Sequence, residues 1–275
     1  MAVESVTETA MIWGTVSGAS MLGMVISLLL SVGLPIFLCI FIYKKTKAWV
    51  PAFFIGCGIF VGFAMILEQI CHAIVLTVTG SMIRDNIWLY AIYGGLAAAL
   101  FEECGRWIAM KFCLKKHLTR ENALMYGAGH GGIEAFLILG MSSMSNLLTA
   151  AMINGGLMEK TMTALEPAQQ EVTYSQLSVL WTTPAYQFYL APVERISAIA
   201  LQIALSILVY SAVKTGRKLH LAAAFGLHFA VDFLTVVCAS TIPTWALELG
   251  LLVVVAVICA AVYKLVYVPS AEKKA

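Results

Sequence analysis

Seven long apolar stretches alternate with short polar segments along the 275-residue chain. They lie near residues 15–43, 50–79, 87–110, 122–150, 189–213, 219–240 and 245–267. Each is long enough for a helix that crosses the hydrocarbon core of a bilayer, which takes about 20 residues. The pattern therefore predicts an all-α, polytopic membrane protein with about seven transmembrane helices.

Composition and charge support this class and add an orientation. Hydrophobic residues make up 61% of the chain and charged residues 12%, with a net charge of +2. Most Lys and Arg residues fall in the loops after the first, third and fifth predicted helices and after the seventh. Basic loops are typical of the cytoplasmic side, so we expect the N-terminus outside and the C-terminus in the cytoplasm. Because the positive charges follow the topology, the sequence predicts no nucleic-acid partner.

The chain is expected to form a single membrane domain over residues 1–275, in contact with the lipid bilayer. One long connection, at about 141–188, is predicted on the outer side. It is rich in Ser, Thr, Gln and Glu, but Leu, Trp and Tyr residues within it indicate that part of it lies along the membrane interface. This connection would serve as a lid or as a simple loop.

Ionisable residues occur inside three of the predicted helices, at 101–106, 129–134 and 227–232. A charged group at the centre of a membrane helix costs roughly 2.5 to 3.5 kcal/mol, even on insertion scales that give low values. With a rise of about 1.5 Å per residue, Glu103, His130 and His228 lie roughly 12 to 13 Å from the cytoplasmic ends of their helices. The equal depths predict that the three stretches meet in one polar site.

Spacing predicts which of these groups pair within a helix, because residues three and four apart share a face. Arg106 can hold Glu102 or Glu103. In the same way, His130 shares a face with Glu134, and His228 with Asp232. Taken alone, each pair would also fit a structural ion pair or a packed histidine.

A second polar group is expected nearer the outer surface. It comprises Glu68 and His72 on the second helix and Glu194 and Arg195 on the fifth, which we expect to pair with one another as structural ion pairs that can reach water. Gln202 lies deeper in the fifth helix, about 18 Å from its cytoplasmic end, where it could face the site.

Two imidazoles with several carboxylates have the composition of a zinc site that leaves one position for water. The same residues would also work without a metal, with a glutamate activating water and a histidine stabilising the oxyanion. Both mechanisms are hydrolytic.

The chain resembles the YhfC-type intramembrane metalloproteases, distant relatives of the CAAX prenyl proteases. The resemblance runs over most of the chain from the second to the sixth predicted helix. It rests on Glu102-Glu103-x-x-Arg106, Tyr126-Gly127-x-Gly129-His130-Gly131-Gly132-x-Glu134, Glu194-Arg195 and His228-x-x-x-Asp232. The chain departs from these families in two places. One residue fewer separates the two glutamates from Arg106 than in the CAAX pattern. Gln202 stands where relatives often have a histidine.

The resemblance implies that Glu102 is the base that activates water, and that Glu103 and Arg106 orient Glu102. It also implies that His130 and His228 are metal or oxyanion partners, supported by Asp232. The candidate catalytic residues are Glu102, Glu103, Arg106, Glu134 and Asp232, and the candidate ligands of Zn²⁺ are His130 and His228.

We therefore predict a multi-pass intramembrane metalloprotease of a bacterial plasma membrane. Its substrate would be a membrane protein or peptide, cut at the cytoplasmic side. One alternative is a proton- or ion-coupled transporter, in which the same residues would form a relay, and another is an inactive membrane scaffold. A transporter would favour inverted repeats and helices broken at the midplane, and the sequence has neither an inverted repeat nor paired proline interruptions.

Overall fold

A computed structural model describes residues 11–272, and within this range the secondary structure consists of helices without strands. Seven spans among these described residues are long and apolar enough to cross a membrane. They are α1 (Gly18–Thr46), α2 to α3 (Pro51–Thr79), α5 with η2 (Ile87–Cys113), α6 to α7 (Arg120–Asn154), α10 (Ala185–Thr215), α11 (Lys218–Ala239) and α12 with η5 (Thr244–Tyr267). The predicted all-α polytopic fold is confirmed, with span ends within a few residues of those expected.

Several spans are built from consecutive helical segments of different type. The second comprises α2 (Pro51–Phe60), the π-helix η1 (Val61–Glu68) and α3 (Gln69–Thr79); the third, α5 (Ile87–Ile108) and η2 (Ala109–Cys113); the fourth, α6 (Arg120–Ala135), η4 (Phe136–Gly140) and α7 (Met141–Asn154); and the last, α12 (Thr244–Val262) and η5 (Tyr263–Tyr267). The shorter helices outside the spans are α4 (Ser81–Arg84), η3 (Lys115–His117), α8 (Leu157–Met162), α9 (Pro167–Thr182) and α13 (Pro269–Glu272).

Side-chain caps mark the starts of the two spans that carry most of the candidate site. The Asn86 side chain accepts hydrogen bonds from the backbone N–H groups of Trp88 and Leu89 at the start of α5. Thr119 accepts one from Asn122 N–H at the start of α6. Such caps satisfy N–H groups that have no partner within the helix, so they define where each helix begins.

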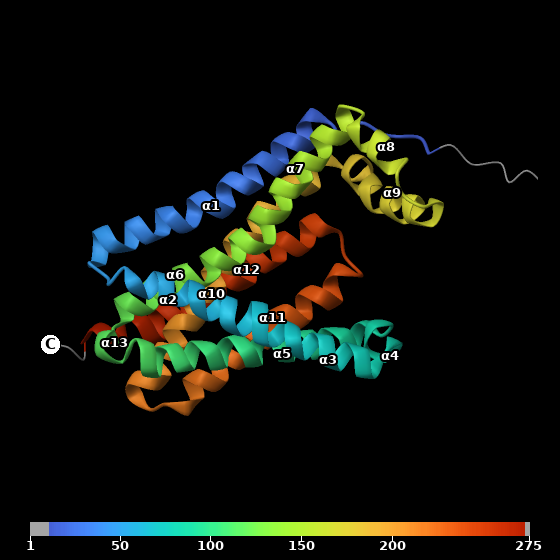
Figure 1. Ribbon diagram of the computed structural model, residues 1–275. Helices are drawn as coiled ribbons and strands as arrows, with labels where there is room; N and C mark the ends of the chain where they lie inside the picture. Colours follow the sequence, from blue (N-terminus) through green and yellow to red (C-terminus); the bar gives the residue numbers. More distant parts are fainter. Residues whose placement is uncertain (1–10, 273–275) are drawn as a thin grey trace, which may run out of the picture.

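The two ends of the bundle differ in the segments that they carry (Figure 1). α4, α8 and α9 lie at one end, so the range 141–188 contains helices as well as turns. The turns between α1 and α2, α5 and α6, and α10 and α11 lie at the other end with α13. These turns carry the basic residues on which the expected orientation depends, and the side of the membrane that they face stays a prediction.

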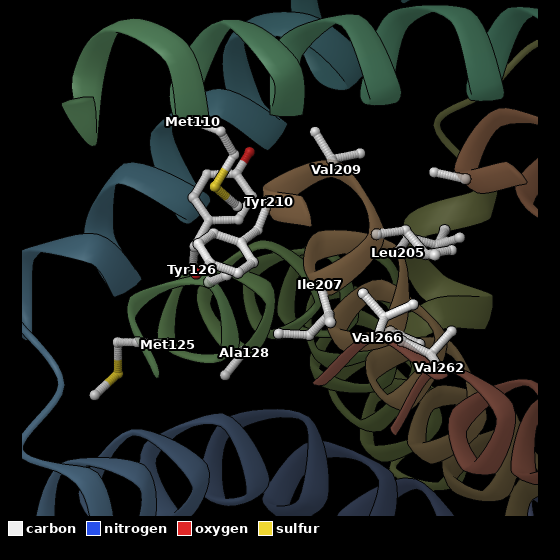
Figure 2. Packing of buried hydrophobic residues seen from close by; sticks show 14 of the residues in the cluster. Met110, Met125, Tyr126, Ala128, Leu205, Ile207, Val209, Tyr210, Val262 and Val266 are labelled. Carbon is white, nitrogen blue, oxygen red and sulfur yellow. The ribbon is translucent and has the colours of Figure 1, made fainter. Parts of the chain in front are cut away.

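α6 and α10 form the centre of the bundle. α6 packs against α1, α2 and α10, and α10 also contacts α5, α11 and α12. Figure 2 shows the apolar cluster between these helices, with Met125 and Tyr126 from α6, Leu205 and Val209 from α10, and Val262 from α12. Side chains on these two helices can therefore reach one another away from lipid.

Glycines let the neighbouring helices approach α6 closely. A Cβ atom added at Gly129 would lie 1.9 Å from the backbone oxygen of Phe53 on α2. One added at Gly127 would lie 2.7 Å from the Cα of Ile203 on α10. Small residues at such positions are typical of packed membrane helices. The glycine-rich run of α6 is thus a packing surface, and it holds His130 at a fixed place in the bundle.

Replacing Gly129 with alanine is expected to destabilise the protein. The added methyl group has no room beside Phe53, and overpacking of this kind typically costs about 1 to 3 kcal/mol. Thermal unfolding in detergent would measure the change. Gly58→Ala is the matched control, because a Cβ atom at Gly58 on the facing helix meets nothing within 4 Å. Equal unfolding midpoints for the two variants would contradict the packing argument.

Candidate functional site

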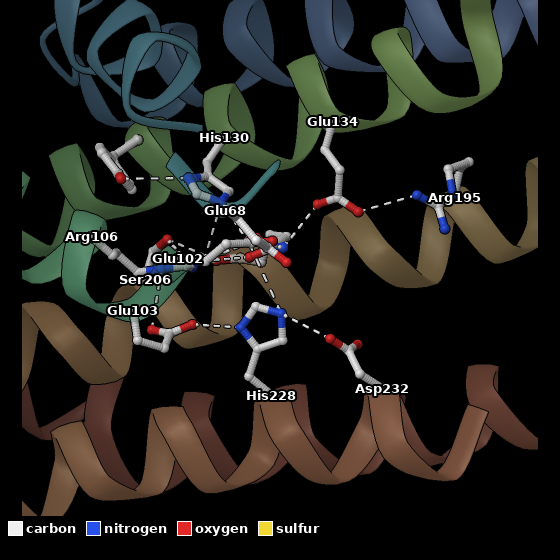
Figure 3. A network of polar contacts seen from close by, with 12 residues as sticks. Glu68, Glu102, Glu103, Arg106, His130, Glu134, Arg195, Ser206, His228 and Asp232 are labelled. Carbon is white, nitrogen blue, oxygen red and sulfur yellow. Dashed lines mark hydrogen bonds and ion pairs between the residues drawn. The ribbon is translucent and has the colours of Figure 1, made fainter. Parts of the chain in front are cut away.

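The three polar stretches meet inside the bundle (Figure 3). α5, α6 and α11 supply Glu102, His130 and His228, which contact one another directly or through shared partners. α10 adds Gln202, which contacts both Glu102 and Glu134. The prediction that the three stretches meet in one polar site is confirmed, and the chemical roles of these residues stay proposals.

The Glu102 carboxylate is the hub of this network. Its Oε2 atom lies 2.9 Å from His130 Nε2 and accepts a 2.9 Å hydrogen bond from the side-chain amide of Gln202. Arg106 Nη2 lies 3.8 Å and His228 Nε2 4.0 Å from the same oxygen. Glu102 is only 7% exposed. One buried carboxylate oxygen thus faces nitrogen atoms of four other side chains.

Arg106 is fully buried and ties α5 to α10. Its Nε atom lies 3.3 Å from Glu103 Oε2, which is the helical pairing that the sequence predicts. Its Nη1 group donates to the backbone oxygen of Gln202 at 2.7 Å and to Ser206 Oγ at 3.0 Å. A further hydrogen bond runs from Nη2 to Gln202 Oε1. Guanidinium geometry suits such multiple contacts, so Arg106 fixes the rotation of α5 against α10.

His228 lies between two carboxylates on different helices. Its Nδ1 atom is 2.9 Å from Glu103 Oε1, and its Nε2 atom is 3.5 Å from Asp232 Oδ2. The pairing with Asp232 is the one expected from the spacing on α11. A carboxylate at Nδ1 holds the ring in one orientation and favours a proton on that nitrogen. Nε2 is then directed toward Asp232 and Glu102.

Glu134 pairs differently from the expectation. It shares a helix with His130, but its Oε2 accepts a 2.8 Å hydrogen bond from Gln202, and its Oε1 lies 3.1 Å from Arg195 Nη1. Arg195 also pairs with Glu194. Arg195 therefore belongs to the site, although the sequence interpretation placed it in a separate outer pair. Its spacing of seven residues from Gln202, about two helical turns, was the signal that could have shown this.

Glu68 and His72 form the other outer pair, as expected. Their side chains lie 3.2 Å apart on neighbouring turns of the second span. His72 also contacts the hydroxyl of Tyr93 on α5 at 2.8 Å. This pair thus links the second span to α5.

A partly open pocket of about 130 Å³ adjoins the network. Its polar wall consists of Glu102, Glu134, Glu194, Arg195, Ser197, Gln202, His228, Asp232 and Thr235, and its apolar wall includes Leu201, Leu251 and Val255. This volume can hold several water molecules, and the wall offers the polar partners that buried water needs. The cavity would therefore place water beside Glu102 and His228.

Imidazole and carboxylate groups are suitable zinc ligands, but their arrangement does not fit a zinc site. Within residues 11–272, no group of three His, Cys, Asp or Glu side chains is placed so that it could hold a metal ion. The Arg106 guanidinium lies 3.4 Å from His130 Nε2, and the Gln202 amide donates to Glu102. These donors occupy directions from which a metal would bind His130 and Glu102.

Comparisons with known proteins identify similar membrane proteins. A family model described as YhfC intramembrane metalloprotease matches residues 30–259. A Bacillus subtilis (strain 168) protein named "Uncharacterized membrane protein YhfC" is 43% identical over 204 residues, which cover 71% of this chain and 76% of the relative. No solved structure matches the chain.

Proposed function

Because the chain belongs to the YhfC intramembrane metalloprotease family, we propose that this multi-pass membrane protein is a peptidase with Glu102 as its general base. The observation that carries the proposal is the position of Glu102. Its buried carboxylate lines the small pocket beside the network, contacts His130 at 2.9 Å and faces His228 across 4.0 Å. Hydrolysis of a peptide bond needs a base, here Glu102, and a hydrogen-bonding group for the oxyanion, here His228, and both line the same small pocket.

In the proposed reaction, a water molecule in the cavity gives a proton to Glu102, and its oxygen attacks the carbonyl carbon of the scissile bond. His228, positively charged with a proton on both ring nitrogens, donates a hydrogen bond from Nε2 to the oxyanion that forms. Glu102 then returns the proton to the departing nitrogen as the C–N bond breaks, which yields a carboxylic acid and an amine. The low-dielectric surroundings strengthen the hydrogen bond to the oxyanion.

The remaining polar residues would orient these two groups. Glu103 holds the Nδ1 side of His228, and Asp232 lies beside its Nε2 atom. Arg106 holds Glu102 and Glu103 from within the same helix. In the predicted orientation the site lies in the cytoplasmic half of the membrane, so the substrate would be a membrane-inserted polypeptide cut on that side.

Replacing His228 with alanine is expected to slow cleavage about 100- to 1,000-fold, the usual effect of removing one oxyanion donor. The measurement is cleavage of a membrane-embedded reporter library by the full-length protein in liposomes. His220→Ala is the matched control, because His220 lies on the same helix and contacts Ser211 outside the network. Wild-type protein that cleaves nothing would contradict the proposal, and a proton flux that is lost with His228→Ala would favour a transporter.

The metal that the family name implies can be tested separately. Metal content would be measured on purified wild-type protein and on the His130→Ala and His228→Ala variants. Stoichiometric zinc that is lost in both variants would mean that Arg106 and Gln202 move away from His130 and Glu102 when the ion binds.

A further inference from the structure

A groove opens on the side of the bundle between α3, α5 and α11. Its volume is about 280 Å³, and its walls include His72, Leu76, Tyr93, Gly94 and Val236. Gly94 lies seven residues from the start of α5 at Ile87, or about 10 Å along the helix axis. A hydrocarbon core is about 30 Å thick, so the groove lies at a depth where lipid surrounds the bundle.

The groove adjoins the candidate site. Asp232 and Thr235 line both the groove and the pocket that Glu102 lines. The Asp232 side chain is 36% exposed, against 9% for Glu102 and 4% for His228. Asp232 therefore reaches from the network toward the groove, and a molecule that fills the groove would end beside the catalytic cavity.

Two adjacent glycines on α5 have different surroundings. A Cβ atom at Gly95 would lie 3.1 Å from the Phe229 ring and 3.2 Å from its backbone oxygen, so Gly95 is where α5 and α11 approach closely. A Cβ atom at Gly94 meets nothing within 4 Å. The packing of α5 against α11 therefore does not require a glycine at position 94, and the absence of a side chain there leaves space in the groove.

The chemistry of the walls suits a polypeptide better than a lipid chain. Leu76 and Val236 can contact apolar side chains, whereas Tyr93, Thr235 and Asp232 offer polar groups. A peptide bond that is to be hydrolysed must leave its helix, and its N–H and C=O groups then need partners inside the membrane. A lipid acyl chain has no group that could pair with the polar wall.

We infer that this groove binds the membrane-inserted apolar segment of a polypeptide substrate and leads its scissile bond to Glu102. The inference rests on the proposed peptidase function. It identifies the substrate class as a transmembrane or membrane-buried segment that enters from the side, between α3, α5 and α11.

Gly94→Leu would fill the groove without disturbing the contact between α5 and α11. The probe is a synthetic transmembrane peptide of about 20 Leu and Ala residues with a photoreactive diazirine at its centre. It would be reconstituted with the full-length protein in phosphatidylcholine liposomes, in the Glu102→Gln background so that the probe stays intact. We expect crosslinks to α3, α5 and α11, and a loss of about tenfold in Gly94→Leu, because a tenfold loss corresponds to about 1.4 kcal/mol, which lies within the usual cost of overpacking.

Gly226→Leu is the matched control, since Gly226 is an exposed glycine on α11 whose Cβ would also meet nothing within 4 Å. It should crosslink as the Glu102→Gln parent protein does. With Glu102 intact, kcat/KM for the reporter library should fall about tenfold in Gly94→Leu and stay unchanged in Gly226→Leu.

The outcomes separate the two proposals. Crosslinks outside the groove, or crosslinks that Gly94→Leu leaves unchanged, would overturn the groove assignment even if the protein cleaves its reporter. A diazirine-labelled phosphatidylcholine that labels the groove and is not displaced by excess peptide would identify lipid as the occupant and overturn it too. Groove crosslinks in a wild-type protein that cleaves nothing would support the binding site and count against the peptidase.

Discussion

Replacing Glu102 with glutamine is expected to lower peptide cleavage about 100- to 10,000-fold, the range that follows the loss of a general base. The amide keeps the shape of the side chain but cannot accept a proton from water. Folding should survive, because Glu102 makes its contacts within a network that retains Arg106 and Gln202. The measurement is the rate of reporter cleavage in liposomes at equal amounts of folded protein.

Glu248→Gln is the control for this change. Glu248 is also 7% exposed, but it lies on α12 and lines neither the cavity nor the groove. Its replacement should leave the cleavage rate near that of the wild type. If Glu102→Gln cleaves as fast as Glu248→Gln, Glu102 is not the base, and Glu103→Gln becomes the variant to compare.

Replacing Arg106 with alanine is expected to destabilise the protein by about 3 to 5 kcal/mol, which is the usual cost of removing one partner of a buried ion pair. The change leaves Glu102 and Glu103 without their buried cation and removes one of the hydrogen bonds that the backbone oxygen of Gln202 accepts, the other coming from Ser206 Oγ. Thermal unfolding in detergent would measure it.

An exposed arginine provides the comparison for this variant. Arg84→Ala on α4 should change stability by no more than about 0.5 kcal/mol, since surface substitutions away from networks have small effects. An unfolding midpoint for Arg106→Ala close to that of Arg84→Ala would mean that the buried guanidinium does not hold α5 against α10.

The sequence predicted the spans and the meeting of the polar stretches because both depend on position along a helix. Length and apolar composition decide which segments cross a bilayer, and a fixed rise per residue converts position into depth. The pairs of Arg106 with Glu103 and of His228 with Asp232 follow from helical spacing in the same way.

Contacts between helices were harder to predict, because they depend on how each helix is rotated against its neighbours. Glu134 lies on α6 with His130, yet it pairs with Arg195 and Gln202 on α10. Spacing along one helix carries no information about such partners. Gln202 was expected only to be able to face the site, whereas its side chain bridges Glu102 and Glu134.

The placement of Arg106 also bears on how the chain enters the membrane during synthesis. Its hydrogen-bond partners on α10 lie 96 and 100 residues later in the sequence. A ribosome adds about 5 to 20 residues per second, so α5 emerges roughly 5 to 20 seconds before these partners exist. In that interval Glu102 and Glu103 are the partners that Arg106 has within its own helix. The ion pair inside α5 thus makes an early charged helix acceptable to the bilayer until the later helix arrives.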